Sequence, residues 1–560
     1  MNYQFLYDKW VNEPYFDETF KEELKALKGD EKEIEERFYK DLEFGTGGMR
    51  GIIGAGCNRM NKYVIRKANQ GFADYIVKTY GEGASIVIAY DSRRKSDEFA
   101  LESALVMAGN GVKAYLFDSI RTTPELSFAV RSLEAQAGIV ITASHNPPEY
   151  NGYKIYDHTG CQLLPHEAEA VVDRVNLIRD WDQVSYMEKD EAVQKGLLVS
   201  IPADQDTLYV EEIKGKSLVD LDQKDKEALK WVFSPLHGTG GRPVERVLKE
   251  LGYTGMVPVA EQMVADSDFT TVKQPNPEEV KAFDLGLTYA KKENADIMIA
   301  TDPDCDRVGV MVKDTDGTYL PLNGNQTGAL LVDYVLNEIK PLPKNPVVIN
   351  TIVTSAIGEA IARKHDVRTM KTLTGFKFIG ERMTSFEESG SHNFLLGYEE
   401  SYGYCFGTHV RDKDAVVASM LVVEMAAKYK AEGKSLLDRL NEIYEEVGYY
   451  QETLIATTMQ GKEGMEKIQE IIQYFRESNF NKLGGVDIER KVDYKEDDTG
   501  LPKSNVLKYF LIDGSWLAVR PSGTEPKIKF YISARDTHKQ GATDKLNHLQ
   551  EAITDLVDRI

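Results

Sequence analysis

Cysteine is scarce in this chain of 560 residues, which has only four, and they show neither the spacing of a metal site nor the density of a disulfide framework. We therefore expect free thiols at Cys57, Cys161, Cys305 and Cys405. Long apolar runs are also missing, because charged residues interrupt each of them, so we expect no membrane association. The first residues have neither a basic region nor an apolar signal core, and we expect a cytoplasmic protein.

Basic residues are outnumbered, and the formal net charge of -22 argues against nucleic acid as a partner, since backbone phosphates need a basic face. The same charge would repel any anionic ligand unless the binding cleft were locally basic. Several basic residues do lie in or beside the motifs described below: Arg50, Lys154, Arg307, Lys377, Arg411, Lys413, Arg520, Lys527 and Lys529.

Two widespread catalytic motifs are absent. The chain has no Gly-x-Ser-x-Gly elbow of an ester hydrolase. It has no Walker phosphate loop either, because the Gly-Lys-Ser segments that begin at Gly215 and Gly433 lack a glycine five residues earlier.

The pattern of apolar residues predicts an α/β protein of several domains. Apolar residues at helical spacing predict helices in the first forty residues, and apolar strands such as 85–90 then alternate with helices such as 98–109. This alternation is typical of mainly parallel sheets. We expect five parts, bounded as 1–40 (helical arm), 41–205 (domain I), 206–318 (domain II), 319–445 (domain III) and 446–560 (domain IV).

The most informative segment, residues 142–147, reads Thr-Ala-Ser-His-Asn-Pro and follows the apolar run 139–141. Ligands of open α/β sheets collect at the carboxyl ends of the strands, which makes Ser144 beside His145 a candidate nucleophile. A surface turn rich in Ser, Asn and Pro would look the same.

The segment 301–307 follows another apolar run, 297–300, and carries carboxylates at Asp302, Asp304 and Asp306. Three crowded carboxylates repel one another unless a cation lies between them, and oxygen-only ligands favour Mg²⁺ over zinc. The segment does not fit a calcium-binding EF-hand loop, whose sixth and twelfth positions are Gly and Glu. A solvated acidic turn stays open, although Arg307 beside the carboxylates would suit a phosphate.

Two further segments follow apolar runs. Residues 519–526 read Val-Arg-Pro-Ser-Gly-Thr-Glu-Pro and combine a guanidinium, two hydroxyls and a close-approach glycine, as a phosphate cradle does. Residues 396–403 place Glu399 and Ser401 between glycines, and carboxylates beside hydroxyls are typical of sugar binding. A Ser-Gly turn and a charged surface loop are the respective alternatives.

Together and in this order, the four segments resemble the α-D-phosphohexomutase superfamily, whose members have phosphoserine, metal, sugar and phosphate loops. Segments 45–51 (Gly-Thr-Gly-Gly-Met-Arg-Gly), 237–240 (His-Gly-Thr-Gly) and 374–377 (Thr-Gly-Phe-Lys) support the resemblance. The residues of these segments are most similar to those of the phosphoglucomutase branch, which includes phosphopentomutases and glucose-1,6-bisphosphate synthases. Many relatives have Gly between the metal-loop aspartates, where this chain has Pro303 and Cys305.

The resemblance implies three similar α/β domains with mainly parallel mixed sheets and a smaller C-terminal α+β domain around a central cleft. It implies a phosphoserine that passes its phosphoryl group to a sugar monophosphate, with glucose 1,6-bisphosphate as intermediate and activator. One Mg²⁺ per chain would be held by Ser144, Asp302, Asp304 and Asp306. The implied catalytic residues are Ser144, His145, Lys154, Arg50 and Lys377. The implied substrate-binding residues are Arg307, Thr374, Gly375, Glu399, Ser401, Arg520, Ser522, Gly523 and Thr524.

The sequence leaves the substrate open among related sugar phosphates. Conversion of glucose 1-phosphate to glucose 6-phosphate is our first expectation, with phosphopentomutase, phosphomannomutase and glucose-1,6-bisphosphate synthase as alternatives. Two alternatives come from other functional classes: a serine-dependent phosphatase and a non-catalytic protein that binds sugar phosphates. Either a monomer or a homodimer is compatible with the sequence.

Overall fold

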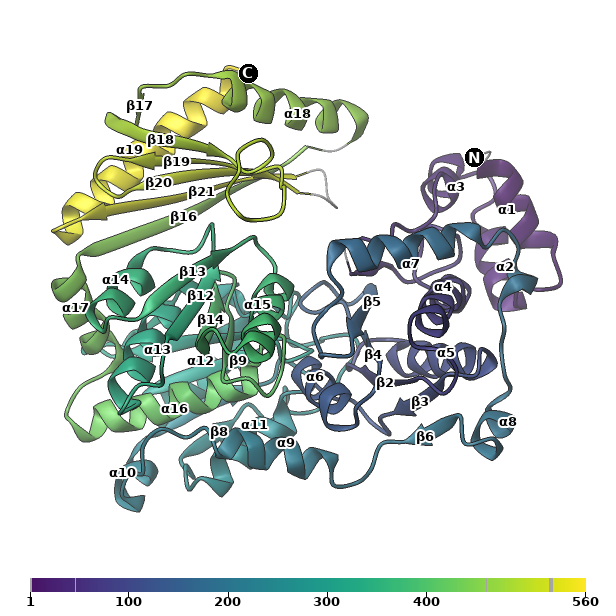
Figure 1. The fold of residues 1–560 in the computed structure, drawn as a ribbon, viewed down its shortest axis with the longest axis horizontal. Coiled ribbons are helices and arrows are strands. Elements are labelled where there is room, and N and C mark those ends of the chain that lie inside the picture. Colours follow the sequence, from purple (N-terminus) through teal and green to yellow (C-terminus); the bar gives the residue numbers. More distant parts are fainter. Residues whose placement is uncertain (1–2, 46, 460, 523–526) are drawn as a thin grey trace. The chain divides into compact units, whose positions relative to one another are not determined.

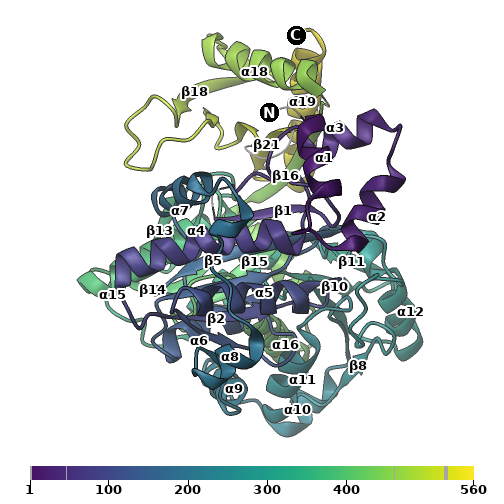
Figure 2. The same cartoon turned by 90° about the vertical axis from the view of Figure 1, so that its right-hand side faces the viewer.

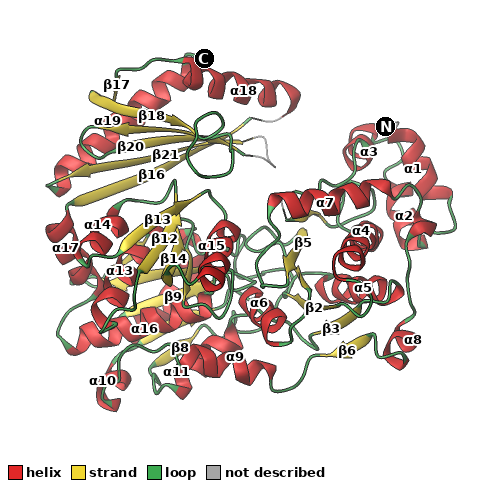
Figure 3. Cartoon of the chain, in the orientation of Figure 1, coloured by secondary structure: helices red, strands yellow, loops and turns green. Residues whose placement is uncertain are grey.

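The chain forms two compact units in a computed structural model that describes residues 3–45, 47–459, 461–522 and 527–560. Unit 1 contains residues 1–324 and 376–435, and unit 2 contains residues 325–375 and 436–560. Figure 1 labels the helices and strands along the chain, and Figure 3 distinguishes helices, strands and loops by colour.

Unit 1 begins with a helical arm followed by a mixed six-stranded sheet with strand order β1-β5-β4-β2-β3-β6. Strands β4, β2, β3 and β6 run parallel, whereas β5 is antiparallel to both of its neighbours. These elements are α1 (Tyr3–Asn12), α2 (Glu18–Ala26), α3 (Glu31–Phe38), β1 (Gly48–Ile52), α4 (Lys62–Tyr80), β2 (Ser85–Tyr90), α5 (Ser96–Gly109), β3 (Lys113–Leu116), α6 (Thr123–Ser132), β4 (Ala137–Ile141), β5 (Tyr150–Asp157), α7 (Pro165–Leu177), α8 (Lys189–Gln194) and β6 (Leu198–Ser200).

Both faces of this first sheet are buried, as the unbroken apolar run of β2 requires. Ile86 and Ile88 pack in a core with residues of α4 and α5, whereas Val87 and Ala89 pack on the other face with residues of α6. Helices α4 and α7 lie side by side, as Figure 2 shows. A Cβ atom on Gly71 would lie 2.4 Å from the Val175 side chain, so only glycine permits this approach.

The second sheet of unit 1 has the order β11-β10-β9-β7-β8, in which β8, β7 and β9 are parallel and β10 and β11 are antiparallel additions. Its elements are α9 (Gln205–Lys214), α10 (Gln223–Ala228), β7 (Trp231–Ser234), α11 (Gly241–Glu250), β8 (Met256–Pro258), α12 (Asp284–Glu293), β9 (Ile297–Thr301), β10 (Val308–Lys313) and β11 (Tyr319–Leu322). Unit 1 closes with the antiparallel pair β14 and β15 and two helices: α15 (Phe376–Ser389), β14 (Asn393–Glu399), β15 (Gly403–Phe406) and α16 (Ala415–Ala431).

Unit 2 contains a parallel strand pair and an antiparallel six-stranded sheet with the order β16-β21-β20-β19-β18-β17. Helices α18 and α19 pack with strands of this larger sheet. The first group of elements is α13 (Gly324–Glu338), β12 (Pro346–Thr351), α14 (Ile357–Lys364) and β13 (Arg368–Thr372). The second is α17 (Leu436–Val447), β16 (Tyr449–Thr458), α18 (Gly461–Glu477), β17 (Lys482–Leu483), β18 (Val486–Asp493), β19 (Leu507–Leu511), β20 (Trp516–Pro521), β21 (Lys527–Asp536) and α19 (Lys539–Asp558).

The expected fold class is confirmed: three α/β portions precede a C-terminal α+β portion. The third α/β portion is divided between the units, since β12 and β13 belong to unit 2 and β14 and β15 to unit 1. Helices α1 to α3 lie in the first forty residues, and the four cysteines are free thiols, all buried. Among the helices in the described part of the chain, none has the length and apolarity needed to cross a membrane.

Candidate active site

Ser144 lies in the loop after β4, where its backbone adopts a left-handed conformation with a φ of 51°. Its side chain is buried, and its hydroxyl donates to Oδ2 of Asp302 at 2.6 Å. Nδ1 of His145 lies 3.1 Å from the same oxygen. Because the hydroxyl hydrogen is engaged by Asp302, the imidazole is the donor in this second contact. The loop therefore presents a serine oxygen to a carboxylate rather than to a histidine base.

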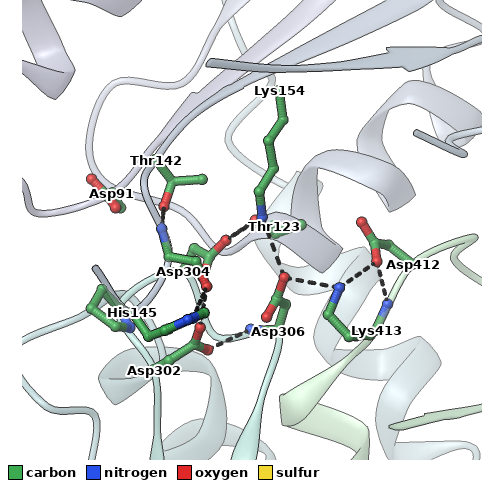
Figure 4. Close-up of polar contacts among 12 residues, drawn as sticks. Asp91, Thr123, Thr142, His145, Lys154, Asp302, Asp304, Asp306, Asp412 and Lys413 are labelled. Carbon is green, nitrogen blue, oxygen red and sulfur yellow. Dashed lines mark hydrogen bonds and ion pairs between the residues drawn. The ribbon is translucent and has the colours of Figure 1, made fainter. Parts of the chain in front are cut away.

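A glycine on β5 allows this strand to lie directly against the serine loop. A Cβ atom on Gly152 would lie 2.3 Å from the carbonyl oxygen of Thr142, closer than any real side chain approaches. Thr142 in turn accepts a hydrogen bond from the backbone N–H of Ser144 at 2.7 Å. The same strand carries Lys154, whose side chain extends toward the aspartates in Figure 4.

The three aspartates lie in a tight loop after β9, and all three are buried. One ligand oxygen from each lies within 4.8 Å of those from the other two. Oδ1 of Asp302 accepts the backbone N–H groups of Asp306 at 3.1 Å and of Arg307 at 2.9 Å, which fixes the first carboxylate. Oδ2 of Asp304 accepts the hydroxyl of Thr123, the first residue of α6, at 2.9 Å.

The segment 237–240 packs against the aspartate loop, because its glycines leave room for the loop backbone. A Cβ atom on Gly238 would lie 2.4 Å from Cα of Pro303, and one on Gly240 would lie 2.8 Å from Sγ of Cys305. The intervening Thr239 donates to the carbonyl oxygen of Pro303 from its backbone N–H at 2.8 Å and from its hydroxyl at 2.9 Å. Close packing thus holds a loop that places three like charges together.

Two lysines offset the charge of the aspartates (Figure 4). Nζ of Lys154 lies 2.8 Å from Asp304 and 3.3 Å from Asp306, and Nζ of Lys413 lies 3.1 Å from both Asp306 and Asp412. Burial lowers the pKa of Lys413, but Asp306 and the neighbouring carboxylates outweigh it and raise that pKa above its usual value. Both lysines are therefore held as cations beside the carboxylates.

The carboxylate set fits a hard divalent cation. Oδ1 of Asp304 and Oδ1 of Asp306 are buried and have no hydrogen-bond partner, so each offers a free ligand oxygen. Burial and the charge of Asp304 raise the pKa of Asp302, as expected for carboxylates that share one site. Burial acts in the same direction on Asp304, yet the ammonium of Lys154 holds the pKa of Asp304 below its usual value. A cation among these oxygens would relieve both the repulsion and the missing partners.

Arg307 connects the aspartate loop to the expected sugar-binding segment. Its guanidinium forms an ion pair with Glu278, and its backbone forms an isolated antiparallel bridge with Gly403. A Cβ atom on Gly403 would lie 2.1 Å from Cδ of Lys413, so this glycine lets the lysine pass toward Asp306. Glu399 is buried at the end of β14. Burial lowers the pKa of Lys413, and the charge of Glu399 opposes this effect together with the larger contributions of Asp306 and Asp412. Ser401 lies between Glu399 and Gly403 and is partly exposed.

The remaining expected catalytic residues of unit 1 have different surroundings. Burial, Arg307 and Arg50 lower the pKa of His145 well below its usual value, so the imidazole is neutral at pH 7. The exposed Arg50 donates to Oδ1 of Asn146 at 3.2 Å, which links β1 to the serine loop. Lys377, at the start of α15, is buried, and its burial lowers its pKa to about 8.

The other expected substrate-binding residues belong to unit 2. Thr374 and Gly375 follow β13, and Gly375 has a φ of 117°, which favours glycine. Arg520 lies near the end of β20, and the backbone N–H of Ser522 donates to the carbonyl oxygen of Lys527 at 2.7 Å. Gly523 and Thr524 lie outside the described residues.

Sequence reasoning missed several residues that contact the site: Asp91, Arg93, Thr123, Glu278 and Asp412. One available signal was the position of Asp91, directly after the apolar strand β2, at the same kind of strand end that carries Ser144. Thr123 is the second residue of the helix-start pattern Thr-Thr-Pro-Glu, in which the side chains of Thr122 and Glu125 form a capping box for α6. Nothing in the local sequence indicates the distant partners of Glu278 and Asp412.

Comparison with protein families gives matches over most of the chain. Models of the phosphoglucomutase/phosphomannomutase family match as α/β/α domain I at residues 41–180, domain II at 207–317, domain III at 323–447 and the C-terminal domain at 457–545.

Among curated proteins, the phosphoglucomutase of Staphylococcus haemolyticus (strain JCSC1435) is 38% identical over 527 residues, which cover 92% of this chain and 94% of that protein. The phosphoglucomutase of Staphylococcus aureus (strain MRSA252) is 38% identical over 540 residues, with the same coverage of 92% and 94%.

Among solved structures, a putative phosphomannomutase from Thermus thermophilus has a TM-score of 0.71 at 22% identity, with 93% of this chain and 99% of that chain covered. The open form of pp63/parafusin from Paramecium has a TM-score of 0.70 at 17% identity, with 93% and 95% covered. At these identities the structures establish a shared fold. The four domain models and the identity to curated relatives over 92% of its length show that the chain belongs to the phosphoglucomutase/phosphomannomutase family.

Proposed function

We propose that the chain interconverts glucose 1-phosphate and glucose 6-phosphate through a phosphoserine at Ser144 and glucose 1,6-bisphosphate. The observation that carries this proposal is the buried contact of 2.6 Å between Oγ of Ser144 and Oδ2 of Asp302, within the set of three aspartates. A serine placed on a carboxylate cluster is poorly arranged to attack an ester, but its phosphorylated form would complete a cation site. The curated phosphoglucomutase relatives support the same reaction class.

The arrangement around Ser144 argues against a serine hydrolase. In a hydrolytic triad, a histidine takes the serine proton while a carboxylate orients the histidine. Here the carboxylate of Asp302 takes the serine hydrogen bond directly, and the neutral His145 donates to the same oxygen. These contacts favour a serine that stores a phosphoryl group.

One Mg²⁺ per chain would be held by Asp302, Asp304, Asp306 and an oxygen of phosphorylated Ser144. When bound, it would neutralise charge on the phosphoryl group and so favour its transfer. Arg307 supplies a fixed positive charge from the same loop, and Lys154 and Lys413 hold Asp304 and Asp306 in place.

Phosphoryl transfer breaks the bond between Oγ of Ser144 and phosphorus and forms a bond to a sugar hydroxyl, whose proton a base accepts. The bisphosphate then reorients and returns its other phosphoryl group to Ser144. Lys377 and Lys154 are the candidates for proton transfer. With a pKa of about 8, Lys377 is partly neutral near physiological pH and is the better base of the two. His145 and Arg50 shape the serine loop.

The roles in substrate binding follow from the resemblance. Glu399 and Ser401 would bind sugar hydroxyls, and Thr374 and Gly375 would also contribute to substrate binding. Arg520 and Ser522 would hold the phosphate that is not transferred, together with Gly523 and Thr524 of the same loop. Because either end of a bisphosphate can occupy such a clamp, the clamp is compatible with reorientation. A central cleft, a cytoplasmic location and a monomeric or dimeric state stay predictions.

The deciding experiment is a coupled assay of glucose 1-phosphate conversion with Mg²⁺ and a trace of glucose 1,6-bisphosphate, run beside ribose 1-phosphate and mannose 1-phosphate. We expect fast turnover of the glucose substrate. Preference for the pentose or mannose substrate would support phosphopentomutase or phosphomannomutase. Formation of the bisphosphate without isomerisation would support glucose-1,6-bisphosphate synthase. Stoichiometric release of inorganic phosphate would contradict a mutase and indicate a phosphatase.

A further inference from the structure

A single buried arginine holds the backbone of the serine loop. Arg93 lies between β2 and α5, and only 3% of its surface is exposed. Its Nη1 donates to the carbonyl oxygens of Pro147 at 2.9 Å and Tyr150 at 3.1 Å, and its Nη2 donates to those of Ser144 and Asn146, both at 2.5 Å. Four carbonyl groups of one loop therefore converge on one guanidinium.

The four contacts engage all the terminal N–H groups of Arg93, since Nη1 and Nη2 carry two hydrogens each. The remaining donor, Nε, faces Oδ2 of Asp91 at 3.3 Å. No terminal donor is left for a substrate phosphate. Arg93 therefore differs from Arg307 and Arg520, whose expected partners are anionic ligands.

The arginine is itself fixed from two sides. Oδ1 of Asp91 accepts the backbone N–H of Arg93 at 3.0 Å and the hydroxyl of Ser96 at 2.7 Å, so the carboxylate is anchored. On the other side, the guanidinium lies over the ring of Phe269, 5.0 Å from its centroid, in a cation–π contact. Phe269 precedes the aspartate loop in the second α/β portion of unit 1, so Arg93 contacts both portions that supply the site.

The loop needs such support because Ser144 has a positive φ, which is unfavourable for a residue with a side chain. A donor on the carbonyl oxygen of Ser144 stabilises this conformation, and the conformation determines where Oγ lies. A lysine could not replace the planar fork, since its single ammonium cannot reach four carbonyl oxygens arranged around two nitrogen atoms.

We propose that Arg93 is a positioning residue for phosphoryl transfer: it holds the serine loop in the left-handed conformation that presents Oγ of Ser144 to the aspartate cluster. This inference rests on the proposed mutase function. Misplacement of a reacting atom by about 1 Å costs about a hundredfold in rate. Loss of the arginine should therefore lower the rate per phosphorylated serine while sugar-phosphate recognition by the other loops persists.

The test compares Arg93→Lys with Arg94→Gln as the matched control. Arg94 is the neighbouring arginine, is exposed, and pairs through its side chain with Asp268. Its backbone carbonyl, which accepts from Asn151 at 2.9 Å, is unchanged by the substitution. Phosphoserine content is measured by intact mass, so that kcat can be expressed per phosphorylated Ser144. Hydrogen exchange is followed at the amides of Ser144, Asn146 and Tyr150, which have defined acceptors.

For Arg93→Lys we expect kcat per phosphorylated serine to fall about a hundredfold, with KM for the sugar phosphate within about threefold of wild type. Exchange at the three amides should rise, whereas Arg94→Gln should match wild type in both measurements. Asp91→Asn provides a second variant, because it keeps the hydrogen-bonding shape but weakens the hold on Arg93. It should show a smaller loss in the same direction.

Two outcomes would overturn the inference. An unchanged kcat per phosphorylated serine, with only less folded protein, would make Arg93 a purely structural residue. A raised KM at unchanged kcat would make it a substrate ligand. The exchange measurement needs no substrate, so it still decides the role of Arg93 if the wild-type protein fails to convert sugar phosphates. In that case, unchanged exchange in Arg93→Lys would overturn the positioning role independently of the proposed function.

Discussion

Unit 1 and unit 2 present their candidate functional residues in contrasting ways. In unit 1, Ser144, Asp302 and Lys154 are buried and contact one another or a shared carboxylate cluster. In unit 2, Arg520 and Ser522 are partly exposed at the end of a β-hairpin. The first arrangement is costly to build and needs close packing to hold like charges together. The arrangement in unit 2 needs no such packing, because the side chains only have to lie at the end of a strand.

This difference indicates that the two units have different roles in the reaction. A buried, hydrogen-bonded set of groups is preorganised, as stabilisation of a transition state requires. A partly exposed guanidinium at a hairpin end remains accessible and can bind an anion without reorganising a core. Unit 1 should therefore determine the rate of the chemical step, and unit 2 should mainly determine how well the substrate is held. Substitutions in the two units should separate kcat from KM.

The largest effect is expected from Ser144→Ala, because it removes the proposed phosphoryl carrier. We expect no measurable turnover and no incorporation of phosphate from glucose 1,6-bisphosphate, while the melting temperature stays close to that of wild type. The control is Ser391→Ala, which removes an exposed hydroxyl before β14 and should leave activity unchanged. Near-normal activity of Ser144→Ala would contradict the proposal that the phosphoryl group is transferred from Ser144 in unit 1.

A somewhat smaller loss is expected from Asp304→Asn, which removes one charge and weakens one free ligand oxygen of the aspartate cluster. Loss of cation-assisted stabilisation amounts to several kcal/mol, so kcat should fall about a thousandfold. Wild-type protein should melt at a higher temperature when Mg²⁺ is added, because a bound ligand stabilises the folded state, and the variant should lose this shift. The control, Asp316→Asn, changes an exposed carboxylate in the turn after β10. An unchanged Mg²⁺-dependent shift in Asp304→Asn would contradict the cation site.

The same contrast explains how much of the site the sequence reveals. Ser144, Asp302 and Arg520 each follow or end an apolar strand, and strand ends are readable from hydrophobic patterns. The hydroxyl, carboxylate and guanidinium chemistry at these ends is readable as well. The fold class could be predicted for the same reason, because the periodicity of apolar residues is local information.

What the sequence could not reveal depends on contacts between distant segments. Thr123 meets Asp304, 181 positions later in the chain, and Glu278 meets Arg307 from the segment 274–279, whose prolines and asparagine indicate a loop but not its partner. The left-handed backbone of Ser144 and its four-carbonyl support by Arg93 have no sequence signal, since serine rarely adopts this conformation. The division of the third α/β portion between two compact units also follows only from packing.

Substitution of Lys377 tests whether a buried lysine of unit 1 takes part in proton transfer. Because burial lowers its pKa to about 8, the neutral base form increases as pH rises through 8, and kcat should rise over the same range. Lys377→Arg introduces a group that stays charged, so the rise should disappear and kcat should fall at least about a hundredfold. The measurement is the pH profile of kcat between about pH 6 and 9.5, with the exposed Lys291→Arg in α12 as control. An unchanged profile in Lys377→Arg would leave Lys154 as the remaining candidate.

The smallest effect is expected from Arg520→Ala in unit 2. Loss of one charge-assisted clamp costs roughly 1.5 to 3 kcal/mol, so kcat/KM should fall about ten- to a hundredfold, mainly through a higher KM. The control is Arg490→Ala, which removes an exposed arginine from β18 of the same sheet, where it lies over the ring of Phe510. A fall in kcat at constant KM would mean that Arg520 stabilises the transition state itself. The contrast between the units would then be wrong, because an exposed strand end would contribute to the chemistry as strongly as the buried cluster does.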